Sequence, residues 1–143
     1  MYTIDEILKM LDGNNSDEVQ QKGIEAAQTV LCINSFLQPG PPFGKRVWDN
    51  CALVLAKRND EDLRPYIAEL LWWLYDVNVP GATTIWNRLL QFKDKEWLLY
   101  FLQWCLSAEQ EDDSIKMWKA TLAEFRNIYD GMTDQSGDGS MIE

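Results

Sequence analysis

The sequence predicts an all-α fold of about seven helices, stacked as antiparallel hairpins in an α-α superhelix. Apolar residues recur at spacings of three and four along most of the chain, which is the period of an amphipathic helix. No stretch shows the alternation that is typical of a strand. The helical segments are short, about nine to seventeen residues, and a hairpin recurs roughly every 30–40 residues. A globular helical bundle would show the same periodicities, so that arrangement remains an alternative.

The first two helices are predicted from their start signals. Thr3 and Glu6 have the spacing of a capping box, which opens a helix near residues 4–12. Residues 15–32 carry a second set of capping and acidic first-turn residues, followed by small and apolar side chains along one face. Two short helices are therefore expected at the N-terminus.

The middle of the chain is predicted as one long loop and three helices. Residues 38–44 are rich in proline and glycine and form the longest expected loop. A third helix is expected over residues 45–57. A fourth is expected over residues 60–75, with Pro65 within its first turn. A fifth helix is expected over roughly residues 80–92.

The sixth expected helix, after a tight turn at residues 93–94, is apolar on most of its sides. Trp97, Phe101 and Trp104 widen its apolar stripe beyond one face. A stripe of this width is typical of a helix that contacts neighbours on two faces. The sequence therefore predicts an inner helix of the stack at this position.

The last helix is expected to follow the polar corner at residues 109–113 and to end near Gly131. Residues 1–131 are then predicted to form a single helical domain, because 46% of the chain is hydrophobic and seven residues are tryptophan. Residues 132–143 have no periodicity and are predicted to be a disordered acidic tail.

The corner between the fourth and fifth helices is the strongest local signal in the chain. Asp76 and Asn78 have side chains that bond backbone N–H groups at turns, although the pair is alternatively a partner-binding corner. Pro80 suits the first turn of the following helix, because its φ is already helical. Gly81 and Ala82 allow another backbone to come close. We interpret Asn78, Pro80, Gly81 and Ala82 as a structural corner.

A family resemblance rests on the same residues. Residues 73–82 resemble the W-L-x-D-x-N-x-P-G-A signature of a small bacterial family of HEAT-like helical proteins of unknown function. Residues 47–52 and 57–63 also resemble this family, and the resemblance covers roughly residues 1–125. Val79 departs from the pattern, which has tryptophan before the proline. The resemblance implies a fold rather than an activity; by analogy only, small acidic helical proteins of this kind are similar to immunity proteins, which block toxins.

Composition excludes several classes of function. The chain has no histidine, so it lacks the commonest general base and most catalytic zinc ligands. Cys32, Cys51 and Cys105 lie in apolar helical patterns, which are typical of buried reduced thiols. We therefore predict no catalytic residue, no metal and no cofactor. The sequence begins without a signal peptide and has no apolar run of about 18 residues, which predicts a cytoplasmic protein without membrane contact.

Charge and aromatic residues suggest a protein partner. The net charge of −10 repels nucleic acid and favours encounter with a basic partner, although solubility alone also explains it. Trp72 lies opposite the apolar stripe of its helix, so it is either exposed or packed on a second layer. The acidic corner at residues 109–113 is either a surface that docks a cationic partner or a solvated turn. The predicted partner-binding residues are Trp72, Tyr75, Asp76, Glu109, Glu111, Asp112 and Asp113.

These observations predict a non-enzymatic protein-binding module, most concretely an immunity-like inhibitor of a basic toxin. Two alternatives come from other classes of function. The first is a hydrolase or transferase that uses paired carboxylates in a helical groove, which requires carboxyl groups with perturbed pKa values that converge on one pocket. The second is a scaffold that only forms homo-oligomers.

Overall fold

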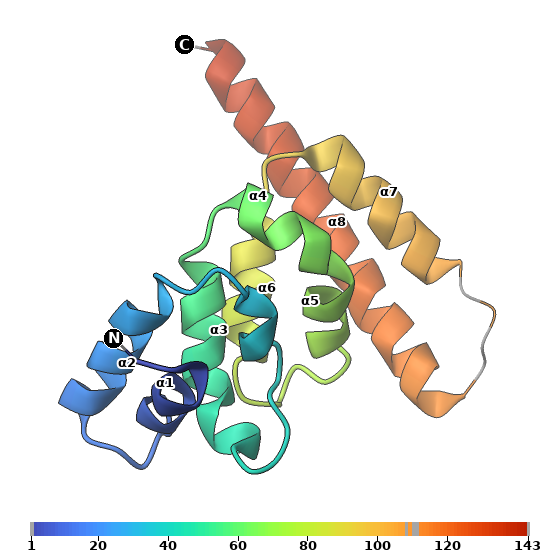
Figure 1. The fold of residues 1–143 in the computed structure, drawn as a ribbon. Coiled ribbons are helices and arrows are strands. Elements are labelled where there is room, and N and C mark those ends of the chain that lie inside the picture. The colour runs from blue at the N-terminus through green and yellow to red at the C-terminus, as the bar shows by residue number, and fades with distance from the viewer. Residues whose placement is uncertain (1, 108, 110–111, 143) are drawn as a thin grey trace.

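The computed structural model describes the backbone of residues 2–107, 109 and 112–142, and the side chains as far as residue 132. Every regular element in these residues is a helix, so the predicted all-α fold is confirmed (Figure 1). In chain order the elements are α1 (Ile4–Met10), α2 (Asp17–Ala27), η1 (Ile33–Phe36), η2 (Gly44–Val47), α3 (Trp48–Ala56), α4 (Asp60–Leu63), η3 (Arg64–Tyr66), α5 (Ile67–Trp73), α6 (Ala82–Leu90), α7 (Lys95–Leu106) and α8 (Asp113–Ile142).

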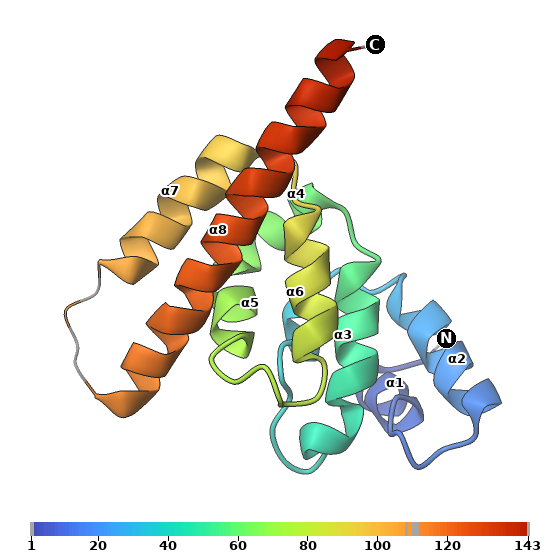
Figure 2. The same cartoon turned by 180° about the vertical axis from the view of Figure 1, so that it is seen from behind.

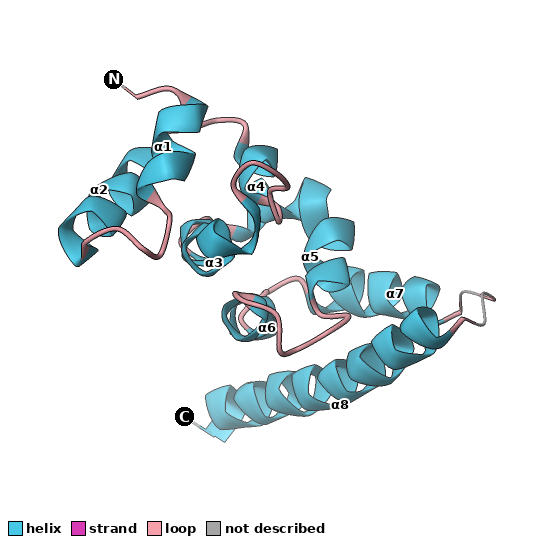
Figure 3. Cartoon of the chain, turned by 90° about the horizontal axis from the view of Figure 1, so that it is seen from below, coloured by secondary structure: helices cyan, strands magenta, loops and turns pink. Residues whose placement is uncertain are grey.

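The helices pack in three main pairs. The first pair, α1 with α2, and the last, α7 with α8, are neighbours in sequence, whereas the middle pair joins α3 to α6 across α4, η3 and α5. Figure 3, seen from below, shows α3 and α6 end-on between the N-terminal pair and α8. Seen from behind, α8 runs diagonally between α7 and α6 (Figure 2). The α3–α6 pairing therefore carries the centre of the fold.

The starts of four helices are fixed by side-chain caps. Thr3 and Glu6 form the predicted capping box, in which the Thr3 N–H donates to Glu6 Oε1 at 2.8 Å and the Glu6 N–H donates to Thr3 Oγ1 at 3.1 Å. Ser16 caps α2, Asn59 caps α4 and Asp94 caps α7, each accepting from a backbone N–H of the first turn. Local sequence therefore determines where these helices begin.

Several predicted helix boundaries are wrong. Helix α2 ends at Ala27, well before the predicted end at residues 31–32. The predicted helix over residues 60–75 is divided into α4, η3 and α5, because Pro65 lies inside it and has no N–H for the helical ladder. The helix after the corner begins at Ala82 rather than Pro80.

The backbone of α8 continues past the predicted end near Gly131 as far as Ile142. In Figure 1 this last part of α8 projects beyond the rest of the helices. The side chains after residue 132 lie outside the described residues, so the disordered tail stays a prediction.

One contiguous cluster of buried side chains connects the helices from α1 to α8. Leu11, Phe36, Leu71 and Phe125 are all fully buried in it, although they come from well-separated parts of the sequence. The Tyr129 hydroxyl donates to the carbonyl oxygen of Phe92 at 2.6 Å, which attaches α8 to the turn before α7. The core therefore extends from the N-terminal helix pair to α8.

Candidate protein-binding surface

The corner between α5 and α6 is packed into the interior. Trp73 is fully buried, its Nε1–H donates to the Pro80 carbonyl oxygen at 3.0 Å, and its ring lies edge-on to Trp48 with centroids 6.1 Å apart. Gly81 has a φ of +87°, and a Cβ there would lie 2.9 Å from both the Trp48 carbonyl oxygen and the Ala52 Cβ. Only glycine fits this position, because both the backbone angle and the available space exclude a side chain.

The polar residues of the corner brace the same turn. The Asn78 N–H donates to Asp76 Oδ1 at 2.9 Å, and the Val79 N–H donates to the Asp76 carbonyl oxygen at 3.2 Å. Pro80 precedes the Gly81 N-cap, outside the first turn of α6 where the sequence placed it. Ala82 is fully buried, as a close approach of backbones requires. Gly81 and Ala82 thus lie as a close approach of backbones requires, Asn78 contributes its backbone N–H rather than its side chain to the bond with Asp76, and a binding role for Asp76 stays a prediction.

Trp72 is part of an aromatic cluster with Tyr75 and Trp118. It stacks on Tyr75 at 5.2 Å between ring centroids and meets Trp118 edge-on at 5.1 Å. The Trp118 Nε1–H donates to the Leu71 carbonyl oxygen at 2.8 Å, which attaches α8 to α5. Trp72 remains 39% exposed and forms one wall of a cavity of about 250 Å³. Both alternatives drawn from the helical wheel therefore apply: Trp72 packs on a second layer and still offers a ring to solvent.

The acidic corner lies between the end of α7 and the start of α8. Glu109, Asp112 and Asp113 are exposed, whereas Glu111 lies outside the described residues. Asp112 Oδ1 accepts from the Ile115 N–H at 2.9 Å and so caps α8. Trp118 of the aromatic cluster follows Asp112 by six residues, about 9 Å of helix. The two predicted groups of binding residues are therefore joined by the first turns of α8.

The outer side of α7 carries exposed aromatic rings that the sequence did not predict. Its side chains are Trp97, Tyr100, Phe101 and Trp104, which we call the aromatic face of α7. Tyr100 is 76% exposed and Trp104 is 65% exposed. Ring centroids lie 5.6 Å apart between Trp97 and Phe101 and 5.7 Å apart between Phe101 and Trp104. The face is thus a continuous row of rings that ends at the acidic corner.

The prediction of an inner helix at this position is wrong. Leu98, Leu102 and Cys105 of α7 are buried, and α7 packs mainly against α8. Figure 1 shows α7 at the edge of the molecule. The spacing of three and four between the aromatic residues was visible in the sequence, but it indicates an apolar face without showing whether a neighbour covers it.

The N-terminal end of the aromatic face is held by Arg64. Its guanidinium carbon lies 4.6 Å from the centroid of the Trp97 ring and 5.7 Å from that of Phe92. Its Nη2 also donates to Asp94 Oδ2 at 3.1 Å. The Trp97 N–H and the Arg64 guanidinium together hold the pKa of Asp94 below its ordinary value. The contacts of Arg64 therefore hold the N-terminal end of the aromatic face in place.

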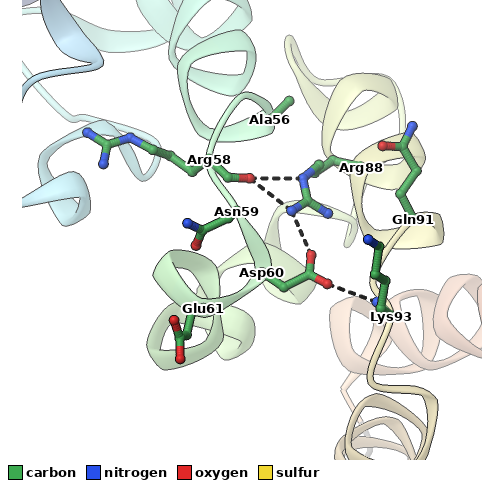
Figure 4. Close-up of a pocket in the computed structure, with 8 residues that line it drawn as sticks. All are labelled: Ala56, Arg58, Asn59, Asp60, Glu61, Arg88, Gln91 and Lys93. Carbon is green, nitrogen blue, oxygen red and sulfur yellow. Dashed lines mark hydrogen bonds and ion pairs between the residues drawn. The ribbon is translucent and has the colours of Figure 1, made fainter.

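A larger cavity, of about 620 Å³, lies where α4 begins and α6 ends (Figure 4). Two carboxylates, Asp60 and Glu61, line it, but they do not form a catalytic pair. Asp60 Oδ1 accepts from Arg88 Nη2 at 2.7 Å and Asp60 Oδ2 accepts from the Lys93 N–H at 2.9 Å. The Glu61 side chain points away from Asp60 in Figure 4. Both oxygens of Asp60 are thus engaged in holding α6 to α4.

The cysteines differ in exposure. Cys51 and Cys105 are buried, and burial raises the pKa of the Cys51 thiol to about 12 and that of Cys105 to about 11. Cys32 is exposed, against the prediction that all three are buried, because α2 ends before it. Within the described residues, no group of three or more cysteines and carboxylates is placed to hold a metal ion.

The described helices also include none that combines the length and the apolar character needed to cross a membrane. Fold and surface together define an all-α domain that exposes a row of aromatic rings next to an acidic turn. A family model described as a domain of unknown function (DUF5071) matches residues 47–130, which is more than half of the chain, and the protein belongs to this family. The match includes the corner, the aromatic face of α7 and the large cavity.

Comparison with curated proteins and with solved structures found no significant match.

Proposed function

We propose that the protein is a non-enzymatic binding module that holds a basic protein on the aromatic face of α7 and the adjoining acidic corner. The observation that carries this proposal is the exposure of Tyr100 and Trp104, at 76% and 65%, on a helix whose opposite side is packed in the core. Tyrosine and tryptophan are enriched among residues that dominate binding energy at protein interfaces. Large exposed aromatic rings next to one another mark an interaction surface.

Charge favours a basic partner. The aromatic face ends within a few residues of Glu109, Asp112 and Asp113, all of them exposed, and the whole chain has a net charge of −10. An arginine or lysine of the partner that stacks on Trp104 would have these carboxylates nearby. Such a surface accelerates encounter through charge and then anchors the partner through its rings.

An inhibitor of a toxin is the most concrete form of this proposal. An acidic face that covers the basic, substrate-binding surface of a nuclease or similar toxin would block it without any chemistry of its own. The three free cysteines suit the reducing cytoplasm, where an immunity-like protein would act. The layered helix pairs on either side of α3 and α6 support a HEAT-like description of the scaffold.

The proposal is tested by parallel capture from extracts of the source organism. The wild-type protein and the Tyr100→Ala/Trp104→Ala double variant are immobilised, captured proteins are identified by mass spectrometry, and the purified partner is measured by calorimetry. Leu31→Ala is the matched control, because Leu31 is 92% exposed on another part of the molecule. We expect a basic partner whose dissociation constant rises at least about tenfold in the double variant and less than about twofold in the control.

The remaining outcomes come from the dependence of the association rate on ionic strength and from the oligomeric state of the protein. The association rate should fall steeply with ionic strength, because the carboxylates act at a distance. A partner that binds the double variant as tightly as the wild type would overturn the proposal, as would an acidic partner. A stable homodimer that Trp104→Ala dissociates, seen by size exclusion with light scattering, would instead show the scaffold alternative.

A further inference from the structure

The large cavity shown in Figure 4 lies at the junction of the start of α4, the end of α6 and the turn that leads to α7. It is separate from the aromatic face, and none of the residues assigned to partner binding lines it. Its volume of about 620 Å³ is sufficient for a small organic ligand.

The first feature of the cavity is a rigid arginine. The Arg88 side chain is only 10% exposed. Its Nε and Nη2 donate to the Arg58 carbonyl oxygen at 3.3 and 2.9 Å, and Nη2 also donates to Asp60 Oδ1 at 2.7 Å. These three bonds fix the plane of the guanidinium. Nη1 has no part in them, and Figure 4 shows it on the side of the group that faces Lys93.

The second feature is a lysine that the same carboxylate positions. The Lys93 backbone N–H donates to Asp60 Oδ2 at 2.9 Å, so Asp60 bridges Arg88 and the backbone of Lys93. The Lys93 side chain is exposed and lines the cavity with Arg88 and Gln91. Among the described residues, no carboxylate lies within ion-pair distance of its Nζ. Arg88 and Lys93 thus line one space, and Asp60, the carboxylate between them, already accepts at both of its oxygens.

The other charged groups around the cavity are turned away from it or are already bonded. Arg58 contributes its backbone, while its guanidinium is turned toward α2, where Nη2 donates to the carbonyl oxygens of Ala27 and Val30. Asp60 already accepts at both oxygens, and Glu61 points away. In a chain of net charge −10, a lysine ammonium without a described carboxylate partner, beside the Arg88–Asp60 ion pair, is a specific feature.

We propose that this cavity binds a small phosphate-bearing anion, with Arg88 Nη1 and Lys93 Nζ as its charged donors. The Lys93 ammonium supplies a positive charge that no described carboxylate neutralises, and the tetrahedral oxygens of a phosphate accept from donors that approach from different directions, such as Lys93 Nζ and Arg88 Nη1. A monocarboxylate matches less well, because the Nε and Nη2 side of Arg88, which would bind it in a bidentate fork, is occupied by the Arg58 carbonyl oxygen and Asp60.

In the test, inorganic phosphate is titrated into the intact protein and binding is monitored by ¹H–¹⁵N NMR. Chloride is used to keep the ionic strength constant. Acetate is titrated in a parallel arm. We expect saturable shifts of the Arg88 Nε–H and the Lys93 N–H with phosphate, and a dissociation constant at least about fivefold weaker for acetate. Lys93→Gln should weaken phosphate binding at least about fivefold, because one charge-assisted hydrogen bond is lost.

The control is Lys116→Gln, which removes the same charge from an exposed site on α8. It should change phosphate affinity by less than about twofold. Lys93→Gln retains the backbone N–H that Asp60 binds, and a thermal melt with and without phosphate checks that each variant is folded. Shifts that rise linearly without saturation, equal weakening by the two lysine variants, or equal affinity for acetate and phosphate would each overturn the proposal.

Discussion

Two tryptophan-rich regions of the molecule behave in opposite ways. In the corner between α5 and α6, Trp73 is fully buried and its N–H is bound by the Pro80 carbonyl oxygen. On α7, Trp104 is 65% exposed and contacts Phe101 at the surface. The corner has the most recognisable sequence in the chain, yet its residues pack in the interior or brace the turn. The surface available to a partner lies instead on a helix without a distinctive motif.

The largest effect is expected for Gly81→Ala, which tests whether the corner is tightly packed. The substitution places a Cβ 2.9 Å from the Trp48 carbonyl oxygen at a φ of +87°, so both strain and a clash with backbone oppose folding. We expect a loss of about 3 kcal/mol or more in the free energy of unfolding, measured by urea denaturation. Gly40→Ala is the control, because a Cβ there meets nothing within 4 Å, and it should stay within about 1 kcal/mol of wild type.

A loss below about 1 kcal/mol in Gly81→Ala would show that the corner can relax, and would contradict the conclusion that only glycine fits this position.

A matched pair of tryptophan substitutions tests the comparison directly. Trp73→Phe removes a buried ring edge and leaves the Pro80 carbonyl oxygen without its donor, so we expect a loss of about 2 kcal/mol in the free energy of unfolding. Trp104→Phe changes an exposed ring and should cost less than about 0.5 kcal/mol. Equal losses in the two variants would mean that α7 is as tightly packed as the corner, which would remove the basis for a free binding face.

The sequence predicted those parts of the fold that depend on local chemistry. The capping box at Thr3 was found as expected, and the cap at Ser16 lies among the predicted start signals of the second helix, because each is set by a few neighbouring residues. The corner was also predicted, because Gly81 and its neighbours carry backbone requirements that are visible in residue type. The division of the helix near Pro65 was missed, although the same residue explains it.

Features that depend on which helices pair were not predictable. The pairing of α3 with α6 joins residues about 30 positions apart, and apolar periodicity does not specify a partner. The aromatic face of α7 was assigned to the interior because a wide stripe shows apolar surface without showing what covers it. The cavity depends on Asp60 meeting Arg88 and Lys93, which are brought together only by that pairing.

The smallest expected effect is the pH dependence of stability that the buried thiols of the two regions cause. Cys51 lies on α3, next to the Ala52 that packs on the corner, and Cys105 lies on the inner side of α7. Burial raises the pKa of Cys51 from 9.0 to about 12 and that of Cys105 to about 11. Above about pH 9 the unfolded chain releases thiol protons that the folded protein retains, so each thiol lowers stability as pH rises toward its folded pKa.

Urea unfolding at several pH values between about 8 and 10 measures this contribution. The free energy of unfolding of the wild type should fall over this interval by about 1 kcal/mol more than that of Cys51→Ala. Cys105→Ala should also make the decrease in the free energy of unfolding smaller, but by no more than Cys51→Ala does. The reason is that α7 lies at the edge of the molecule and opens more readily. Identical pH slopes in all three proteins would show that neither thiol is held away from water, and the distinction between a sealed corner and an open α7 would then rest on the tryptophans alone.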